Sequence, residues 1–302
     1  MSVETGQKVA AAQVDLSVVT PSYGYAHFLE DGLLSVAMQE GVHCEHIVQD
    51  GCSDDGTVEL LRRYDDRVDW RSEPDEGQSD ALNKGIARAR GRWLAWLNAD
   101  EFYLPDGLAA LVAEGDRTGA DVVYGDALFS DGEGRMTRVL PQHPFSGFVL
   151  KSYGCFISTV ACIVRREAAG PEPIDASMRR MMDWDLYLRM LAEGRRFAYV
   201  PVPVGVFRAH DTRITATERR GFFQRLNHDQ GFGREYEMMN ERYGAMRVRR
   251  VGHLLHGAQK LTSGGYTRQL RARSLRGSDL RWFASEDGAA SWHAVRDRCY
   301  GG

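Results

Sequence analysis

Short apolar runs alternate with segments of helical periodicity through the first half of this chain. The apolar runs span residues 16–20, 45–49, 68–72, 93–97 and 121–125. Apolar residues recur at helical spacing over 26–39, 57–64 and 79–90, and Pro105 suits the first turn of a further helix. Strands that alternate with helices form βαβ units, so the sequence predicts an α/β fold with a mostly parallel central sheet.

The alternation fades after about residue 135. Two further strands are predicted at 157–164 and 196–207, with a helix at 182–192 between them. Beyond about residue 215 the chain is polar, helical in pattern and rich in arginine. We therefore predict an α/β domain over residues 14–215 and a helical, basic C-terminal region over 216–302.

Charge is unevenly distributed along the chain. Residues 245–281 carry nine Lys or Arg against one acid, Asp279, whereas the whole chain has a net charge of −4. Two interpretations of this basic region stay open: a helical face that is solvated or packs on an acidic surface, and a peripheral contact with an anionic membrane. No recognised nucleic-acid-binding module accompanies the charge, so we expect no nucleic-acid partner.

The cysteines indicate a reducing compartment. There are five of them and no CxxC pair, which predicts neither a disulfide framework nor a zinc site. Residues 1–15 lack the apolar core of a signal peptide, and no apolar run approaches the roughly 20 residues that span a bilayer. We expect a cytoplasmic location, with attachment to the inner face of the membrane left open.

Polar residues follow the ends of several predicted strands. Tyr23 comes after the first strand, Asp50 after the second, and Asn98 and Asp100 after the fourth. Ligands of open α/β sheets bind beyond the carboxyl ends of the strands. A carboxylate at such a position can hold a hard cation through oxygen, and such a cation can bridge a diphosphate. The alternative is that these acids only begin turns and helices.

The predicted helix at 182–192 carries two acids in its first turn. Asp183 there either complements the helix dipole or acts as a general base toward a hydroxyl group. Asp185 is spaced to pair with Arg189 one turn later. The motifs GxGxxG after the first strand, GxxxxGK[ST] and GxSxG are absent from the sequence. Nicotinamide dehydrogenases, P-loop NTPases and α/β-hydrolases are therefore disfavoured.

Five segments together resemble the family-2 glycosyltransferases with the GT-A fold. In the family's order they are residues 18–39, 48–57, 73–91, 93–108 and 182–190, and the resemblance covers roughly residues 14–215. It implies a Rossmann-like, mostly parallel sheet flanked by helices, followed by a C-terminal helical extension. It also implies an inverting glycosyltransferase of the hexosyltransferase type, which uses Mn²⁺ or Mg²⁺ to move a sugar from a nucleotide-diphosphate donor to an acceptor hydroxyl.

The resemblance carries residue roles with it. The implied nucleotide-sugar-binding residues are Thr20, Pro21, Tyr23, Asp50, Asp75, Gly77, Gln78, Lys84, Asn98, Ala99 and Asp100. Tyr23 is expected to stack on the base, and Asp50 to hydrogen bond to it. Asp100 in the DXD position is the expected metal ligand, with His210 beside the metal, and Asp183 is the expected catalytic base.

The sequence departs from the family pattern at two of these positions. Asn98 stands where the first acid of the DXD motif is usual, and Met182 stands where a glutamate commonly precedes the base. Two alternatives therefore stay beside the glycosyltransferase: a catalytically weak module that binds sugar nucleotides, and a metal-dependent nucleotidyltransferase or phosphohydrolase. An acid that hydrogen bonds to the nucleobase suits uracil or thymine, so a UDP- or dTDP-sugar is the expected donor.

The acceptor is left open between a carbohydrate, a lipid-linked molecule and a small molecule. A homo-oligomer is also left open.

Overall fold

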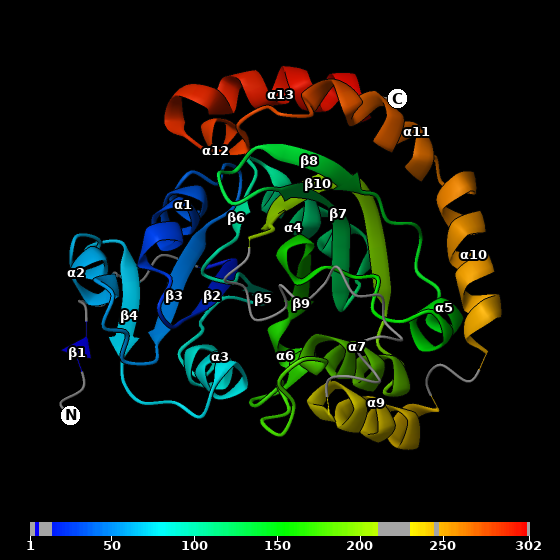
Figure 1. The fold of residues 1–302 in the computed structure, drawn as a ribbon, viewed down its shortest axis with the longest axis horizontal. Coiled ribbons are helices and arrows are strands. Elements are labelled where there is room, and N and C mark those ends of the chain that lie inside the picture. Colours follow the sequence, from blue (N-terminus) through cyan, green and yellow to red (C-terminus); the bar gives the residue numbers. More distant parts are fainter. Residues whose placement is uncertain (1–3, 6–13, 211–229, 245–247, 301–302) are drawn as a thin grey trace.

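The computed structural model describes residues 4–5, 14–210, 230–244 and 248–300. Within them the strands form one sheet in the order β1-β4-β3-β2-β5-β9-β7-β10-β6, and β8 pairs with β7 at the side (Figure 1). The strands are β1 (Glu4–Thr5), β2 (Leu16–Ser22), β3 (Cys44–Asp50), β4 (Val68–Ser72), β5 (Trp93–Trp96), β6 (Phe102–Tyr103), β7 (Val122–Ser130), β8 (Met136–Leu140), β9 (Cys162–Arg165) and β10 (Phe197–Arg208).

The first part of the sheet is parallel, as predicted. β4, β3, β2 and β5 run in one direction, with Thr20 opposite Val48 and Asp50 opposite Ser72. Because the register is continuous, these strands end along one edge of the sheet. The predicted strands at 16–20, 45–49, 68–72 and 93–97 are thereby confirmed.

The second part of the sheet is mixed. β9 lies antiparallel between β5 and β7, while β10 runs parallel to β7. The sheet is therefore not parallel throughout, because β6, β8 and β9 each pair antiparallel with a longer neighbour. The strand predicted at 157–164 begins only at Cys162, after a single 3₁₀ turn, Thr159–Ala161. The short strands β6 and β8 were not predicted.

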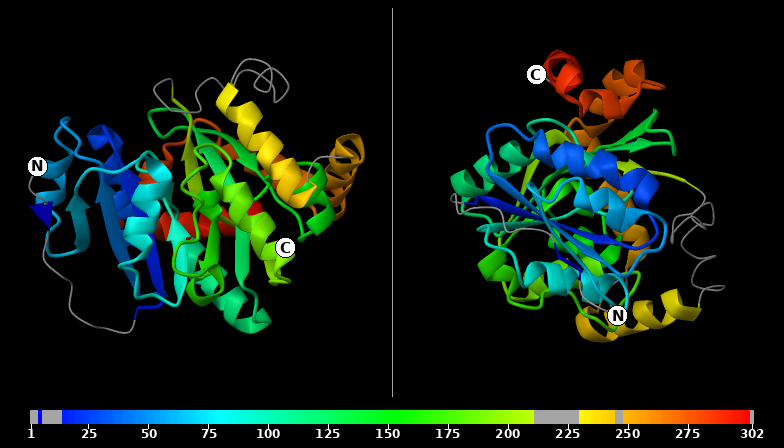
Figure 2. Two further views of the ribbon diagram at one scale, coloured as in Figure 1. Left: turned by 90° about the horizontal axis from the view of Figure 1, so that it is seen from below. Right: turned by 90° about the vertical axis from the view of Figure 1, so that its left-hand side faces the viewer.

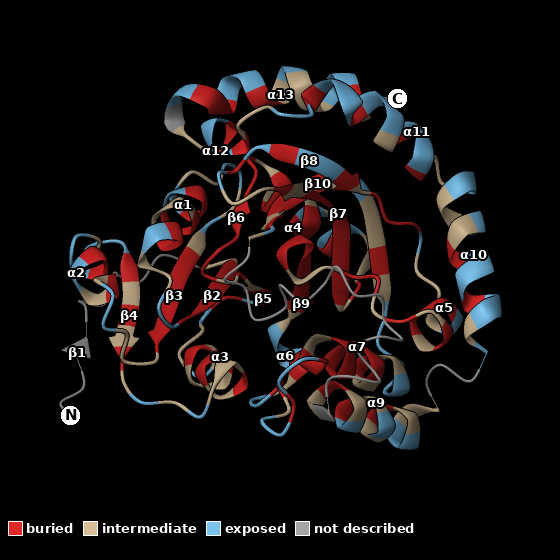
Figure 3. Cartoon of the chain, in the orientation of Figure 1, coloured by how far each residue is buried: buried red, intermediate tan, exposed pale blue. Residues whose placement is uncertain are grey.

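Helices cover both faces of the sheet. They are α1 (Ala26–Ala37), α2 (Thr57–Arg62), α3 (Gln78–Ile86), α4 (Gly107–Thr118), α5 (Gly147–Ser152), α6 (Arg166–Ala169) and α7 (Met182–Ala192). Apolar side chains of α3 and α7 pack against one face, and those of α1 and α4 against the other. Figure 3 shows the strands buried between these layers. An α/β architecture is thus confirmed, and α7 has the predicted bounds.

The C-terminal region is helical, as its sequence pattern predicts. Its helices are α9 (Gln230–Tyr243), α10 (Arg249–Thr262), α11 (Gly265–Arg271), α12 (Leu280–Phe283) and α13 (Glu286–Tyr300). In Figures 1 and 2, α9 and α13 lie at opposite ends of the molecule. The predicted boundary near residue 215 lies outside the described residues. None of the helices that the structure describes combines the length and the apolar character needed to cross a bilayer.

Two buried contacts fasten this region to the sheet. Trp292 of α13 is fully buried in a cluster that also contains Phe102 and Val206 of the sheet. Arg268 of α11 enters the core, where its Nε lies 2.9 Å from the Oδ2 of the buried Asp126 on β7. The same guanidinium donates to the backbone oxygen of Gln142 at 3.0 Å. The basic region is therefore partly interior and not only a solvated face.

Removal of the buried cation should destabilise the fold. We expect Arg268→Ala to lower the free energy of unfolding by about 3–5 kcal/mol, because Asp126 would keep a buried charge without its partner. Burial raises the pKa of Asp126, so protonation should relieve part of this loss as the pH falls. Urea denaturation measures the effect. The exposed Arg273→Ala is the control and should change stability by less than about 0.5 kcal/mol; equal losses would contradict the assignment.

Candidate active site at the strand ends

Asp50 is a fully buried carboxylate at the last residue of β3. Its Oδ1 accepts a hydrogen bond from Ser53 Oγ at 2.5 Å, and its Oδ2 accepts from Ser72 Oγ at 2.6 Å and from the Ser53 backbone N–H at 3.0 Å. These donors compensate the loss of water around a buried anion. The carboxylate is thus held rigidly where β3 and β4 end.

The loops after β2 and β3 are tied together. Ser53 Oγ accepts a hydrogen bond from the Gly24 backbone N–H at 2.9 Å, and Asp55 Oδ2 accepts from the Ala26 N–H at 2.8 Å. Asp55 Oδ1 also accepts from Thr57 at the start of α2. Ser53 and Asp55 therefore hold the turn after β3 and the start of α2.

An exposed ring and a carboxylate flank Gly51, which directly follows Asp50. A Cβ atom on Gly51 would lie 2.6 Å from Asp75 Oδ2 and 3.3 Å from Tyr23 Cδ2. A larger residue at this position would require the Asp75 side chain to move. The Tyr23 side chain is 71% exposed, and desolvation raises the pKa of Asp75. Tyr23, Asp50 and Asp75 thus gather around one turn.

Thr20 and Pro21 stand beside this turn as parts of β2. The Thr20 hydroxyl is hydrogen bonded to His46 Nε2 on the neighbouring strand, at 2.9 Å. The side chain of Thr20 therefore stabilises the pairing of β2 with β3. Pro21 is buried opposite Gln49. Both residues shape the end of β2.

The start of α3 meets the segment that follows β5. Asn98 Oδ1 accepts hydrogen bonds from Gln78 Nε2 at 2.7 Å and from Trp96 Nε1 at 2.8 Å. Gly77 precedes α3 with a φ of 113°, which favours glycine, and its N–H donates to Asp75 Oδ1 at 2.8 Å. Gln78 and Trp96 thus orient the side chain of Asn98, whereas Ala99 is buried in the core beneath α1 and α2.

Asp100 and His210 come together from distant parts of the chain. Their Oδ2 and Nε2 atoms are 2.9 Å apart, and the His210 ring lies 4.5 Å from the ring of Phe28 and 5.9 Å from that of Tyr25. Ligands about 2.1 Å from one octahedral ion lie about 3 Å apart when they occupy adjacent positions. The two side chains are hydrogen bonded to each other, and the same separation suits two ligands of a Mn²⁺ or Mg²⁺ ion.

A complete protein cage for a metal is not present in the described part of the chain. No group of three or more His, Cys, Asp or Glu residues is arranged there to hold an ion. Mg²⁺-type sites commonly use one or two protein carboxylates and complete the shell with substrate phosphates and water. The pair of Asp100 and His210 fits that kind of open site.

Asp183 lies in the first turn of α7 and is only partly exposed. Desolvation raises its pKa from 3.8 to about 6, although the Trp184 N–H donates to its Oδ1 at 2.8 Å. Cys155 Sγ is 3.7 Å from its Oδ2. A carboxylate with this pKa can accept a proton near neutral pH.

The start of α3 also reaches α7. Ser79 Oγ donates to the Met178 backbone oxygen at 2.5 Å and contacts Met182 Sδ at 3.2 Å. Gln78 and Ser79 thus connect Asn98 on one side with the residue before Asp183 on the other. The start of α3 thereby links the segment after β5 to the start of the helix that carries the predicted base.

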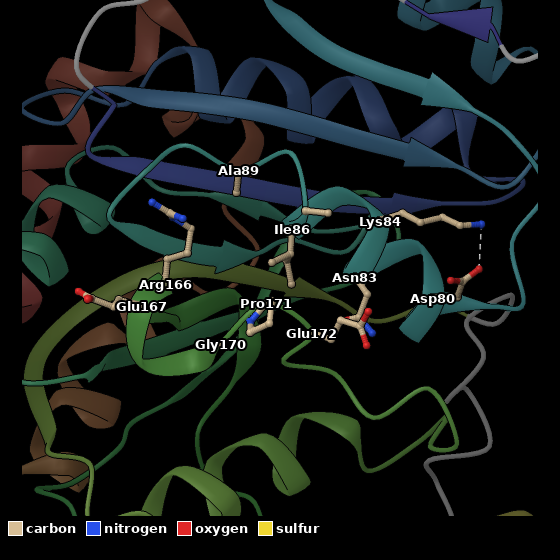
Figure 4. Close-up of a pocket in the computed structure, with 11 residues that line it drawn as sticks. Asp80, Asn83, Lys84, Ile86, Ala89, Arg166, Glu167, Gly170, Pro171 and Glu172 are labelled. Carbon is tan, nitrogen blue, oxygen red and sulfur yellow. Dashed lines mark ion pairs between the residues drawn. The ribbon is translucent and has the colours of Figure 1, made fainter.

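Lys84 is oriented differently from the other predicted donor residues. Its Nζ pairs with Asp80 at 2.9 Å and donates to the Pro74 oxygen at 2.8 Å. It lines an open groove of about 640 Å³ between α3 and α6, which Figure 4 shows with Arg166 and Glu167 at the other end. The groove contains none of the other predicted site residues.

Two contacts of α9 around α7 were not predicted. The carboxylate of Glu235 accepts hydrogen bonds from the backbone N–H groups of residues 179–181, at 2.9–3.0 Å. Asp185 pairs with Arg242 at 3.2 Å and Tyr243 at 2.9 Å and not with Arg189, which donates to backbone oxygens at 169 and 173. The i,i+4 prediction was wrong because α9 supplies closer partners, which no local pattern signals.

Comparison with known sequences identifies relatives of the α/β part. Residues 17–170 match the sequence model of glycosyl transferase family 2. TuaG of Bacillus subtilis, a glycosyltransferase named for teichuronic acid biosynthesis, is 39% identical over 98 residues, which is 31% of this chain and 38% of TuaG. ExoO of Rhizobium meliloti, a succinoglycan biosynthesis protein, is 32% identical over 130 residues, which is 42% of this chain and 37% of ExoO. The matches thus span less than half of these curated relatives.

Solved structures share the fold over almost the whole chain. Staphylococcus aureus TarS 1-349 in complex with UDP-GlcNAc has a TM-score of 0.57 at 15% identity, over 94% of this chain and 91% of that one. The mannosyltransferase PcManGT of Pyrobaculum calidifontis, in complex with GDP-Man and Mn²⁺, has a TM-score of 0.56 at 16% identity, over 97% and 88%. The predicted GT-A fold is confirmed.

The contact between α9 and α7 yields a stability prediction. We expect Glu235→Ala to lower the free energy of unfolding by about 1–3 kcal/mol, because three backbone donors before α7 lose a charged acceptor. Glu237→Ala changes an exposed residue of the same helix and is the control. Urea unfolding of both variants is the measurement. Indistinguishable midpoints would contradict the role assigned to Glu235.

Proposed function

The chain belongs to glycosyl transferase family 2, and we propose that it transfers a sugar from a nucleotide-diphosphate donor to an acceptor hydroxyl with inversion at the anomeric carbon. The observation that supports this proposal most is that the start of α3 contacts residues on both sides: Asn98 after β5, and Met182 directly before Asp183. These contacts link the ends of the parallel strands, where α/β folds bind ligands, to a carboxylate with a raised pKa.

The nucleoside is proposed to bind at the turn around Gly51. The exposed ring of Tyr23 offers a stacking surface. Asp50 is fully buried and accepts three hydrogen bonds from Ser53 and Ser72, so it would reach a base N–H once the Ser53 turn moves aside. An acceptor at that position suits uracil or thymine, so a UDP- or dTDP-sugar is the proposed donor. Asp75 and Gly77 border the same turn, and Gln78 and Asn98 come next toward the sugar.

The diphosphate is proposed to lie near Asp100 and His210. These two side chains would hold Mn²⁺ or Mg²⁺, which when bound neutralises the charge that develops on the departing diphosphate. The complex of PcManGT with GDP-Man and Mn²⁺ supports a divalent ion in this fold. The phosphates and water would complete the coordination shell.

Asp183 is the proposed general base. Its carboxylate takes the proton of the acceptor hydroxyl while the acceptor oxygen forms a bond to the anomeric carbon. The bond from that carbon to the diphosphate oxygen breaks, and the nucleoside diphosphate leaves from the opposite face. Partial burial keeps water away from the carboxylate, and Cys155 and the Trp184 N–H fix its position.

The acceptor is proposed to be a carbohydrate, either free or linked to a lipid. The names of TuaG and ExoO refer to teichuronic acid and succinoglycan, which supports a role in polysaccharide biosynthesis. Product analysis distinguishes this proposal from its rivals. Transfer yields a nucleoside diphosphate and a glycosylated acceptor, whereas nucleotidyl chemistry yields a monophosphate or pyrophosphate, and a binding module yields neither.

Asp183→Asn tests the base. We expect transfer to fall by at least about a hundredfold, and wild-type activity to fall about tenfold per pH unit below the pKa of about 6. Because folding raises this pKa, the charge of Asp183 opposes folding at neutral pH. The variant should therefore melt at or above the wild-type temperature there. Glu193→Gln, at the other end of α7, is the control; near-normal turnover by Asp183→Asn would disprove the assignment.

Asp100→Ala tests the metal site. Melting temperatures with UDP-, dTDP- and GDP-sugars, with and without Mn²⁺, report binding to the native state. A ligand at about a hundred times its Kd stabilises by about 2.7 kcal/mol. We expect Mn²⁺ to increase the donor-induced shift in the wild type and in the control Asp54→Ala, an exposed acid. The increase should vanish in Asp100→Ala; its persistence would contradict the site.

A further inference from the structure

The leucines of α10 are exposed, whereas its buried residues are small or polar. Leu254 is 75% exposed and Leu261 68%, while Gly252 and His256 are buried. A helix that packs on a core through its apolar face shows the opposite arrangement. This reversal means that the apolar side of α10 is not used by the fold described here.

Specific contacts hold α10 in this orientation. Gly252 lies against the end of α5, where a Cβ atom would come 2.5 Å from Ser152 Oγ. The His256 ring stacks on Tyr153 with centroids 3.9 Å apart and planes 15° apart, and its Nδ1 lies 2.9 Å from His143 Nε2. The helix therefore cannot simply roll over to bury its leucines.

Exposed apolar residues follow one another along the chain from α10 into α11. They are Val248, directly before α10, and Val251, Leu254, Leu255, Leu261, Tyr266 and Leu270, and we call them the α10–α11 surface. At 100° per residue, the α10 members fall within one side of the helix. Figures 1 and 3 show α10 at the periphery of the molecule, outside α5.

The charged residues in the segment that carries this surface are of one sign. Residues 248–278 contain seven Lys or Arg and no Asp or Glu. Arg250, Arg273 and Arg276 are exposed, whereas Arg268 is buried against Asp126. An exposed apolar stripe with basic residues and no acids fits the interface of an anionic bilayer.

We propose that the α10–α11 surface docks the protein onto anionic lipid membranes. The leucines would insert among the upper acyl chains, and the arginines would contact lipid phosphates. A second copy of the chain is a poorer occupant, because a symmetric pairing would bring together two segments that both carry only basic charges. Docking needs neither donor nor acceptor, so its failure would leave the proposed transfer reaction untouched.

Vesicle sedimentation of the full chain tests the proposal. We expect binding to vesicles of phosphatidylcholine with phosphatidylglycerol, little binding to phosphatidylcholine alone, and weaker binding as salt is added. The double variant Leu254→Ser, Leu261→Ser should lower the partition coefficient at least about tenfold, since two apolar side chains no longer leave water. Arg273→Glu with Arg276→Glu should lower it on the anionic vesicles.

Leu34→Ser is the matched control, because Leu34 is an exposed leucine on α1 outside the α10–α11 surface. It should bind vesicles as the wild type does. Wild-type protein that ignores anionic vesicles, or a double leucine variant that binds them equally well, would overturn the proposal. So would a wild-type dimer in solution that the double variant abolishes without any vesicle binding.

Discussion

Four parallel strands, β4, β3, β2 and β5, end along one edge of the sheet, and the arrangement of the candidate donor site depends on this shared edge. Asp50 can remain a buried carboxylate only because Ser72 on the neighbouring strand and Ser53 in the following turn donate to it. The same turn binds the loop after β2. A slip in strand register would separate Ser72 from Asp50 and leave a buried carboxylate with fewer hydrogen-bond donors.

The second half of the site depends on contacts between distant helices. α3 bridges Asn98 and the start of α7, and α9 supplies Glu235 to the backbone donors just before α7. Contacts from α3 and from α9 thereby hold the start of α7, which carries Asp183, in a fixed position. A fixed position matters for a general base, because small displacements of a proton acceptor from its substrate cost much of the rate.

Local patterns were enough to predict the parallel strands and α7, because apolar periodicity is a property of each segment by itself. The antiparallel direction of β9 was not predictable in this way, since it depends on its pairing with β5 and β7. The number of basic residues in the C-terminal region likewise did not indicate that Arg268 is buried while Arg273 and Arg276 are exposed. Motif order suggested Asp50, Asp100 and Asp183 as candidates. Ser72, which donates to Asp50, and Glu235, which accepts from the backbone before α7, carry no sequence signal because they act through tertiary contacts.

The central proposal is that a nucleoside diphosphate and a divalent ion bind beyond the ends of the parallel strands, between Asp50 and Asp100. A crystal structure of the protein with UDP or dTDP and Mn²⁺ tests it most directly, because manganese is located by its anomalous scattering. The account predicts the base beside Tyr23 and Asp50, and a manganese peak bonded to Asp100 and His210. A nucleotide in the groove beside Lys84 and Arg166, or a manganese peak away from Asp100, would contradict it.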